Sequence, residues 1–261
     1  MKTESLKQYI SDGKLNERFA SLYGSDRIAL QKSRYIKAIE GFTEQYGQTD
    51  TDVQIFSVSG RSEISGNHTD HNNGKVLAGS INLDVIAVVA PNNNGIITVK
   101  SEGFSKVDVV DIKNVKPTDE CKFCSYGLIT GMCEGFEQRG YKTGGFDAYT
   151  TSNVLKGSGL SSSAAFEVMI GNILNHLYNN GNIDNIEIAK IAQYAENVHF
   201  GKKSGLMDQM ACAVGGFIYI DFNDAKNPVI KKIDFDMNKY GYLLYIVDTG
   251  GNHADLSDDY S

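Results

Sequence analysis

Charged, amide and imidazole side chains are concentrated in residues 60–74, whose sequence is GRSEISGNHTDHNNG. Arg61, His68, Asp70 and His71 lie within these fifteen positions, a density of hydrogen-bonding groups that a turn alone does not need. Polyol recognition needs carboxylates, amides and imidazoles that meet adjacent hydroxyls, so the segment is a candidate polyol site. A solvated turn is one alternative. A metal site formed by the two histidines and the aspartate is another, although alternating positions on one loop give weak metal geometry.

A second candidate site is the glycine- and serine-rich segment 157–163. Gly157 and Gly159 let the backbone approach a ligand closely, and the serines open a convincing helix. Free N–H groups at a helix start, aligned with the helix dipole, form an anion site suited to phosphate. No Gly-Lys-Ser/Thr ending is present, so the segment is not a Walker A loop. A serine N-cap after a flexible turn explains this segment equally well on its own.

Two acidic residues stand in largely apolar surroundings. Asp208 lies in the run GLMDQM, and its flanking residues predict that it is partly buried. Because a buried carboxylate is costly without a partner, we expect a cation beside it. Glu196, twelve positions earlier, is a second acid in an apolar stretch, but an ordinary exposed helix glutamate explains it as well.

The elements that carry these segments alternate without strict order, which indicates an α+β fold. The first 24 residues are expected to be helical, and a helix over 27–47 is expected to bury Leu30 among other apolar residues. A strand at 53–58 leads into a loop from Ser59 to Gly74. Further strands are expected near 84–90, 95–100, 107–112, 145–151, 216–222, 229–235 and 242–248, and further helices near 121–138, after the serine-rich segment, over 185–199 and from 206.

Composition limits the classes of partner. The chain has 261 residues, 41% of them hydrophobic, enough for a sizeable core. Its net charge of −7 argues against nucleic acid or a membrane surface as the main partner. Short apolar runs and a polar N-terminus lead us to expect a cytoplasmic protein. The four cysteines lack the second pair or paired histidines of a zinc site, so buried or half-buried free thiols are expected.

Taken together and in this order, the three segments resemble the galactokinases of the GHMP small-molecule kinase family. Residues 60–74 resemble the family signature Gly-Arg-x-Asn-Leu-Ile-Gly-Glu-His-Thr-Asp-Tyr-Asn-x-Gly, 157–165 its phosphate loop, and 205–209 its Gly-Ile-Met-Asp-Gln segment. The resemblance implies an α+β N-terminal lobe of the GHMP kinase type (ribosomal protein S5 domain 2-like). That lobe would cover residues 1–240, with a helical leader over 1–50. The start of a second α+β lobe would follow at 241–261.

The implied activity is ATP-dependent phosphorylation of galactose, or a close analogue, at the anomeric hydroxyl. The full-length form is expected to be a monomer. Asp208 would lie beside that hydroxyl as general base or electrostatic partner, and Arg61 would pair with it across the pocket. Ser163 and Glu196 would hold Mg²⁺. The ATP phosphates would be bound by Gly157, Ser158, Gly159, Leu160, Ser161, Ser162 and Ser163. The sugar would be contacted by Asn67, His68, Asp70, Gly205 and Tyr260.

The chain departs from the family pattern in three places. Asn67 stands where the family usually has Glu, and His71 replaces the usual Tyr. The chain also ends at Ser261, without the third, glycine-rich motif of the family's second domain. A truncated second lobe is therefore expected, with an unpaired edge or uncovered apolar face near Tyr242–Val247. The other functions considered are a non-catalytic sugar and ATP sensor, and a GHMP kinase for another small alcohol.

Overall fold

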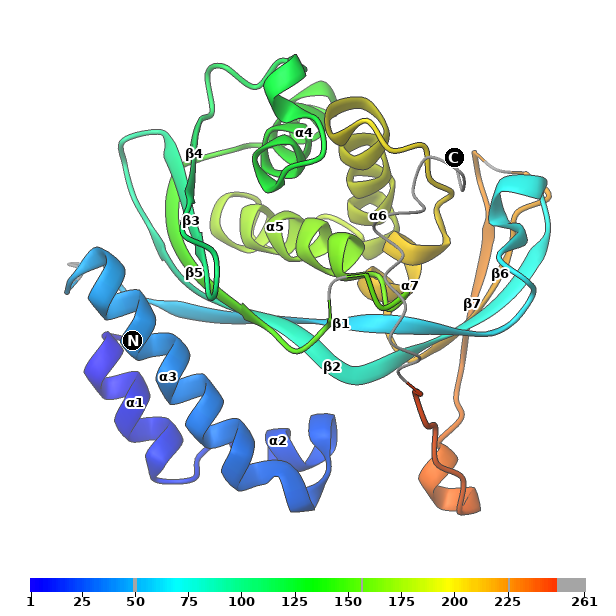
Figure 1. Ribbon diagram of the computed structural model, residues 1–261, viewed down its shortest axis with the longest axis horizontal. Helices are drawn as coiled ribbons and strands as arrows, with labels where there is room; N and C mark the ends of the chain where they lie inside the picture. Colours follow the sequence, from blue (N-terminus) through cyan, green and yellow to red (C-terminus); the bar gives the residue numbers. More distant parts are fainter. Residues whose placement is uncertain (49–50, 156, 225, 248–261) are drawn as a thin grey trace.

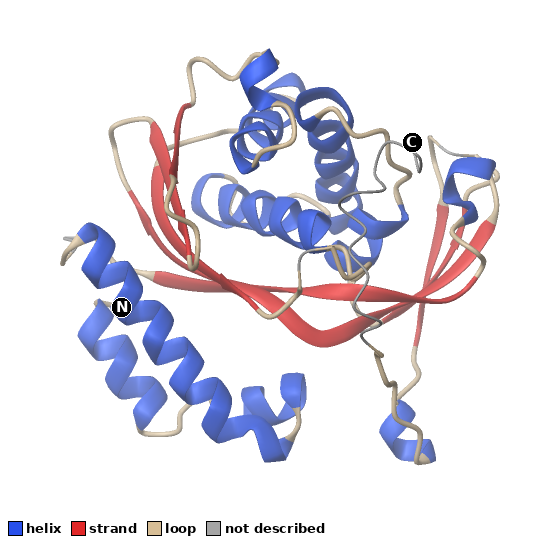
Figure 2. Ribbon diagram, in the orientation of Figure 1, coloured by secondary structure: helices blue, strands red, loops and turns tan. Residues whose placement is uncertain are grey.

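The strands expected between residues 53 and 235 pair into one seven-stranded sheet in the computed structural model, which describes residues 1–48, 51–155, 157–224 and 226–247 (Figures 1 and 2). Most of the sheet follows the order β4-β3-β5-β2-β6-β7, and β1 pairs with β2. Of the paired strands only β3 and β5 run parallel. The strands are β1 (Gln54–Ser65), β2 (Lys75–Pro91), β3 (Ile96–Ser101), β4 (Val107–Asp111), β5 (Phe146–Ser152), β6 (Phe217–Asp221) and β7 (Val229–Ile233).

Helices cover both faces of this sheet. The N-terminal helices α1, α2 and α3 lie on one face, and α4 to α7 lie on the other (Figure 1). The helices are α1 (Thr3–Ser11), α2 (Asn16–Tyr23), α3 (Ile28–Tyr46), α4 (Ser125–Gln138), α5 (Ser162–Tyr178), α6 (Asn185–Tyr194) and α7 (Met207–Val214), and α6 continues as the π-helix η4 (Ala195–Phe200).

The long strand β2 separates two hydrophobic cores. Successive side chains of a strand point to opposite faces, so alternate residues of β2 enter different cores. Val85, Ala87 and Val89 pack under α5, whereas Ile86 and Val88 pack against the leader helices. Burial on both faces explains why this part of β2 is a continuous apolar run rather than an alternating one.

A buried carboxylate fastens the leader to the sheet. Asp84 is almost fully buried and accepts hydrogen bonds from the hydroxyls of Tyr23 and Ser57. Arg34 on α3 forms an ion pair with the same carboxylate and also donates to the Asp84 carbonyl oxygen. These contacts compensate the desolvation of the aspartate. They also fix α3 against the strands.

Two local expectations for the first half of the chain are wrong. Leu30 is 55% exposed on α3, because the buried stripe of that helix runs through Tyr35, Ile39 and Phe42 instead. The strand expected to stop at residue 58 continues to Ser65, so Arg61 lies on a strand and not in a loop. The polar residues of β1 obscure the strand pattern in the sequence. Two irregularities in the pairing of β1 with β2 also interrupt the alternation of buried and exposed side chains.

The expected helix over 121–138 begins only at Ser125. A short 3₁₀ turn, Asp119–Cys121, precedes it, and Phe123 between them has a φ of 56°, which breaks the helix. Cys121 and Cys124 therefore do not share a helix face. All four cysteines are nevertheless free thiols, and only Cys124 is more than slightly exposed, as expected.

The last six described residues are apolar, and the rest of the described chain leaves their side chains exposed. The six side chains of Tyr242–Val247 are between 43% and 79% exposed, as the sequence predicts. The expected strand is absent from 242–247, whereas 248–261 lie outside the described residues. The division into lobes at residue 240 stays a prediction. None of the helices in the described part of the chain is long and apolar enough to cross a membrane.

Candidate active site

The serine-rich segment touches β1 directly. Arg61 N–H donates to the Leu160 carbonyl oxygen at 3.2 Å. Gly60 permits this approach, because a Cβ at that position would lie 2.7 Å from the same oxygen. Gly157 and Gly159 adopt positive φ, as does Ser161, which precedes the first residue of α5. The segment is therefore a tight turn held between the sheet and the start of a helix, as expected.

Arg61 and Asp208 meet at this turn. Arg61 on β1 donates from Nε and Nη2 to Asp208 Oδ1, at 2.9 and 2.6 Å. Arg61 Nη1 donates to the Gly159 carbonyl oxygen at 2.5 Å, and the Ser161 hydroxyl donates to Asp208 Oδ2 at 2.6 Å. The expected pairing is thus present, 147 positions apart in the sequence. It joins β1, the serine-rich turn and the first turn of α7 (Figure 1).

The electrostatics of Asp208 favour the carboxylate. Burial alone raises the pKa of this carboxyl, but the charge of Arg61 and hydrogen bonds from His68, Ser161 and Arg61 outweigh it, so the pKa lies far below its usual range. The Asp208 side chain is 24% exposed, whereas the Arg61 side chain is 7% exposed. Asp208 is therefore an ionised, oriented and partly accessible hydrogen-bond acceptor.

A compact turn over residues 66–74, the histidine-rich turn, places two more polar groups beside this pair. His68 has a φ of 54° and is followed by the 3₁₀ turn Thr69–Asn72. The Glu63 carboxylate accepts from His68 N–H at 2.8 Å, and the Thr69 hydroxyl donates to the Gly66 carbonyl oxygen. His68 Nε2 lies 3.5 Å from Asp208 Oδ1 and His68 Nδ1 lies 3.1 Å from Asp70 Oδ1. Hydrogen bonding to Asp208, and then to Asp70, raises the pKa of His68 to about 10.

Gly205 makes room for Asp70. A Cβ on Gly205 would lie 1.8 Å from Asp70 Oδ2, which accepts from Met207 N–H at 3.2 Å. Burial works against the Asp70 carboxylate, but the hydrogen bonds from His68 and Met207 N–H outweigh it and lower its pKa. Asp70 therefore ties the histidine-rich turn to the start of α7. Asn67 is exposed on the same turn, with a φ of 55°.

A third cluster lies at the first turn of α5. Ser163 Oγ donates to Glu196 Oε1 at 3.1 Å, and Glu196 Oε2 accepts from Ser204 and from Gln209 Nε2 at 2.6 and 2.7 Å. Glu196 is 2% exposed, so it is not the ordinary exposed helix glutamate that its sequence also allowed. It belongs to the π-helix η4, a wide turn that is often found at functional sites. The Ser163 hydroxyl oxygen and the Glu196 carboxylate oxygen are both hard ligands, the kind that Mg²⁺ prefers.

Two acidic residues at the site were not predicted from the sequence. Glu63 holds the histidine-rich turn through its carboxylate, and Glu167 lies fully buried one helical turn after Ser163. Glu167 Oε2 accepts from Gln209 Nε2 at 3.2 Å. Burial, and then the charge of Glu196, raise its pKa well above the usual range. For Glu167, the only signal in the sequence was the presence of an acid at a core-facing position of the helix after the serine-rich segment.

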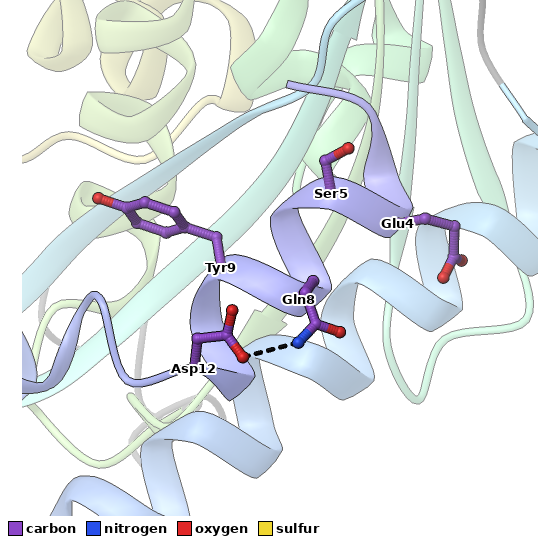
Figure 3. Close-up of a pocket in the computed structure, with 5 residues that line it drawn as sticks. All are labelled: Glu4, Ser5, Gln8, Tyr9 and Asp12. Atoms are coloured by element: carbon purple, nitrogen blue, oxygen red, sulfur yellow. Dashed lines mark hydrogen bonds between the residues drawn. The ribbon is translucent and has the colours of Figure 1, made fainter.

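The structure thus brings together the predicted residues of β1, the histidine-rich turn, the serine-rich turn, η4 and the start of α7. Tyr260, the remaining predicted sugar contact, lies outside the described residues. A hollow elsewhere runs along α1 on the leader, lined by Glu4, Ser5, Gln8, Tyr9 and Asp12 (Figure 3). It lies on the opposite face of the sheet from α5 and α7.

Comparison with known families agrees with this geometry. Residues 127–216 match "GHMP kinases N terminal domain", and residues 40–91 match "Galactokinase galactose-binding signature". The chain belongs to the GHMP kinase family. Among the curated members, it is 31% identical over 226 residues to a galactokinase of Streptomyces coelicolor, a match covering 85% of this chain and 56% of that protein. It is 34% identical over 211 residues to a galactokinase of Limosilactobacillus reuteri, covering 77% and 52%.

Solved GHMP kinases show the same fold. The Lactococcus lactis galactokinase complexed with galactose has a TM-score of 0.67 and 29% identity, covering 75% of this chain and 50% of that one. The Methanococcus jannaschii mevalonate kinase, at 15% identity, shares the fold with a TM-score of 0.59. This GHMP kinase chain spans about half the length of the galactokinases that it matches.

Proposed function

We propose that this GHMP kinase chain carries the sugar site and the phosphate loop of an ATP-dependent sugar 1-kinase. Its substrate would be galactose or a close analogue, phosphorylated at the anomeric hydroxyl to give the sugar 1-phosphate and ADP. The observation that carries the proposal is the convergence of Arg61, Asp208 and Ser161, because it places a fixed cation and a carboxylate against the serine-rich turn. Phosphoryl transfer depends mainly on such positioning and charge neutralisation.

Asp208 would accept the hydrogen bond of the anomeric hydroxyl and orient it toward the phosphoryl group. Its depressed pKa makes it a weak base, which favours an orienting and electrostatic role over early proton abstraction. In a loose transition state the hydroxyl keeps its proton until late, so a weak base suffices. Arg61 would keep Asp208 ionised and stabilise charge on the transferring group.

The nucleotide phosphates would lie along the turn from Gly157 to Ser163. The start of α5 supplies unpaired N–H groups, and the positive end of its dipole favours phosphate. Ser163 and Glu196 would hold Mg²⁺, since their oxygens lie 3.1 Å apart and ligands about 2.1 Å from an octahedral ion are about 3 Å apart. When bound, Mg²⁺ supplies positive charge that neutralises the phosphates.

The sugar hydroxyls would meet Asn67, His68, Asp70 and Gly205. His68 would donate to an oxygen, because its raised pKa keeps it protonated at neutral pH. Asn67, in place of the family's usual glutamate, has no charge but both donates and accepts. This substitution is the reason for proposing galactose or a close analogue. A monomeric, cytoplasmic enzyme that uses a free sugar and ATP is part of the same proposal.

The test is sugar-dependent ADP release, measured for galactose, N-acetylgalactosamine, arabinose and glucose, with calorimetric binding of each sugar and of ATP beside it. Asp208→Asn should reduce turnover by more than tenfold, whereas Asp119→Asn, at an exposed aspartate of the same charge, should leave it unchanged. Sugar and ATP binding without ADP release would favour the sensor. Turnover of Asp208→Asn within tenfold of the wild type would remove Asp208 from the chemistry.

A further inference from the structure

The histidine-rich turn brings three metal-binding side chains to one point. Ligand atoms of His68, Asp70 and His71 all lie within 4.8 Å of one another. Asp70 Oδ1 lies between the imidazoles, 3.1 Å from His68 Nδ1 and 3.6 Å from His71 Nδ1. Ligands about 2.1 Å from a tetrahedral Zn²⁺ are about 3.4 Å apart, so both measured distances are close to those of a metal site.

The backbone explains why alternating and adjacent positions converge. An extended loop would direct His68 and Asp70 alike but send His71 to the opposite side. Instead, His68 has a left-handed φ of 54° and Thr69–Asn72 form a 3₁₀ turn. The turn is closed by Gly74 N–H, which donates to the Thr69 carbonyl oxygen at 2.8 Å. The weak geometry expected from the sequence is therefore corrected by the fold.

The surroundings of the three side chains suit a cation. Asp70 Oδ2 is held by Met207 N–H, which orients the carboxylate. His68 Nε2 faces Asp208 Oδ1 at 3.5 Å, so a carboxylate lies behind a candidate ligand histidine, as in many zinc sites. Asp70 and Asp208 carry two negative charges, which face Arg61 and the protonated His68, so a cation that displaces the His68 proton still lies between carboxylates. His71 is 60% exposed, which leaves the site open to an ion from solvent.

We propose that His68, Asp70 and His71 form a binding site for Zn²⁺. Two imidazoles and one carboxylate are a donor set that zinc binds through nitrogen and oxygen, and imidazole disfavours Mg²⁺ and Ca²⁺. Three protein ligands leave the fourth position of the ion for water or a small oxygen ligand. The cation replaces the proton shared by His68 and Asp70, so binding releases a proton.

The metal site does not depend on kinase activity. Its overlap with sugar binding does rest on the proposed function, because His68 and Asp70 are also the proposed sugar contacts. In that case Zn²⁺ and sugar would exclude one another. The site depends on His71, which stands where the family usually has tyrosine.

The experiment uses tag-free 261-residue protein titrated with Co²⁺, whose visible absorption reports its coordination, followed by displacement with Zn²⁺. We expect one site per chain, with absorption typical of four- or five-coordinate nitrogen and oxygen ligands. His71→Tyr should weaken Zn²⁺ binding by about 100-fold or more, since losing even an outer partner of a ligand costs 10–100-fold. His176→Tyr, at an exposed histidine on α5, should bind as the wild type does.

His71 is exposed, so His71→Tyr should keep the fold, and the urea-unfolding midpoint verifies this. The proposal is overturned if folded His71→Tyr binds Co²⁺ and Zn²⁺ as tightly as the wild type. It is also overturned if the absorption shows thiolate coordination, which would assign the ion to Cys124 or another cysteine. These readouts are independent of ADP release, so failure of the metal site and failure of the kinase proposal are distinguishable.

Discussion

Glu167→Gln is expected to make the stability of the protein less dependent on pH. Glu167 is fully buried, and Gln209 donates to its Oε2 while its Oε1 has no hydrogen-bond partner among the described residues. Burial and the nearby charge of Glu196 raise the pKa of Glu167 far above the ordinary value of 4.5. The folded protein therefore holds a proton that the unfolded chain releases in mildly acidic solution.

The sign and size follow from proton linkage. Above pH 4.5 the unfolded state binds fewer protons at this position than the folded state, so stability falls as the pH rises toward the folded pKa. One proton of difference changes the free energy of unfolding by about 1.4 kcal/mol per pH unit. This group alone therefore lowers the stability with each pH unit for as long as the pH stays below its folded pKa. Glutamine imitates the protonated acid and has no such dependence.

Urea unfolding at several pH values between 5.5 and 7.5 measures the effect. The free energy of unfolding of Glu167→Gln minus that of the wild type should rise with pH, by up to the value of one proton, about 1.4 kcal/mol per pH unit. Contributions of His68, Asp208 and other groups cancel in this difference to the extent that they are independent. Glu17→Gln, at an exposed glutamate of α2, is the matched control. A difference for Glu167→Gln that stays constant with pH would refute the assignment of a neutral buried acid.

Three further outcomes are expected. Gly205→Ala should lose about 1–3 kcal/mol in urea unfolding, because its Cβ would lie 1.8 Å from Asp70 Oδ2 and displace that carboxylate from its backbone partner; a loss under about 0.5 kcal/mol would mean that the turn has room to shift. In the native protein Ellman's reagent should modify Cys124 first, because the other three thiols are buried, and Cys124→Ser should abolish the fast phase; a fast phase that persists would contradict this. His199→Phe should cost about 1.5–3 kcal/mol in thermal or urea unfolding, because the buried imidazole lies 2.7 Å from the Glu134 carboxylate; an unchanged midpoint would mean that this hydrogen bond adds nothing.

The sequence predicted the site best where burial imposed a chemical requirement. An aspartate between apolar residues must find a cation, and Arg61 meets Asp208 as that argument demands. Glycines before a serine-rich helix start likewise required a tight turn, and the turn is present. The order of the elements followed from hydrophobic periodicity, although their ends shifted by several residues.

The features that the sequence did not predict depend on tertiary contacts. Arg61 lies on a strand because the polar residues of β1 pair with β2, a partner that periodicity does not reveal. Leucine is usually a buried residue type, but Leu30 lies outside the stripe of α3 that packs against the sheet. Glu63 and Glu167 have no motif that distinguishes them from ordinary glutamates, and only the folded contacts do so. The convergence of His68 and His71 depends on the left-handed φ of His68 and on the 3₁₀ turn that follows it.

The contact between Gly60 and Leu160 has a consequence for self-association. Among the described strands β1 pairs only with β2, so its other side is a free sheet edge, which in many proteins templates pairing with a second chain. Here the Arg61 N–H on that side is occupied by the Leu160 carbonyl oxygen. The turn proposed to hold phosphate therefore also blocks this position of the edge against pairing with a second chain. Substitutions that loosen the turn would free this N–H as well as weaken any binding of a nucleotide.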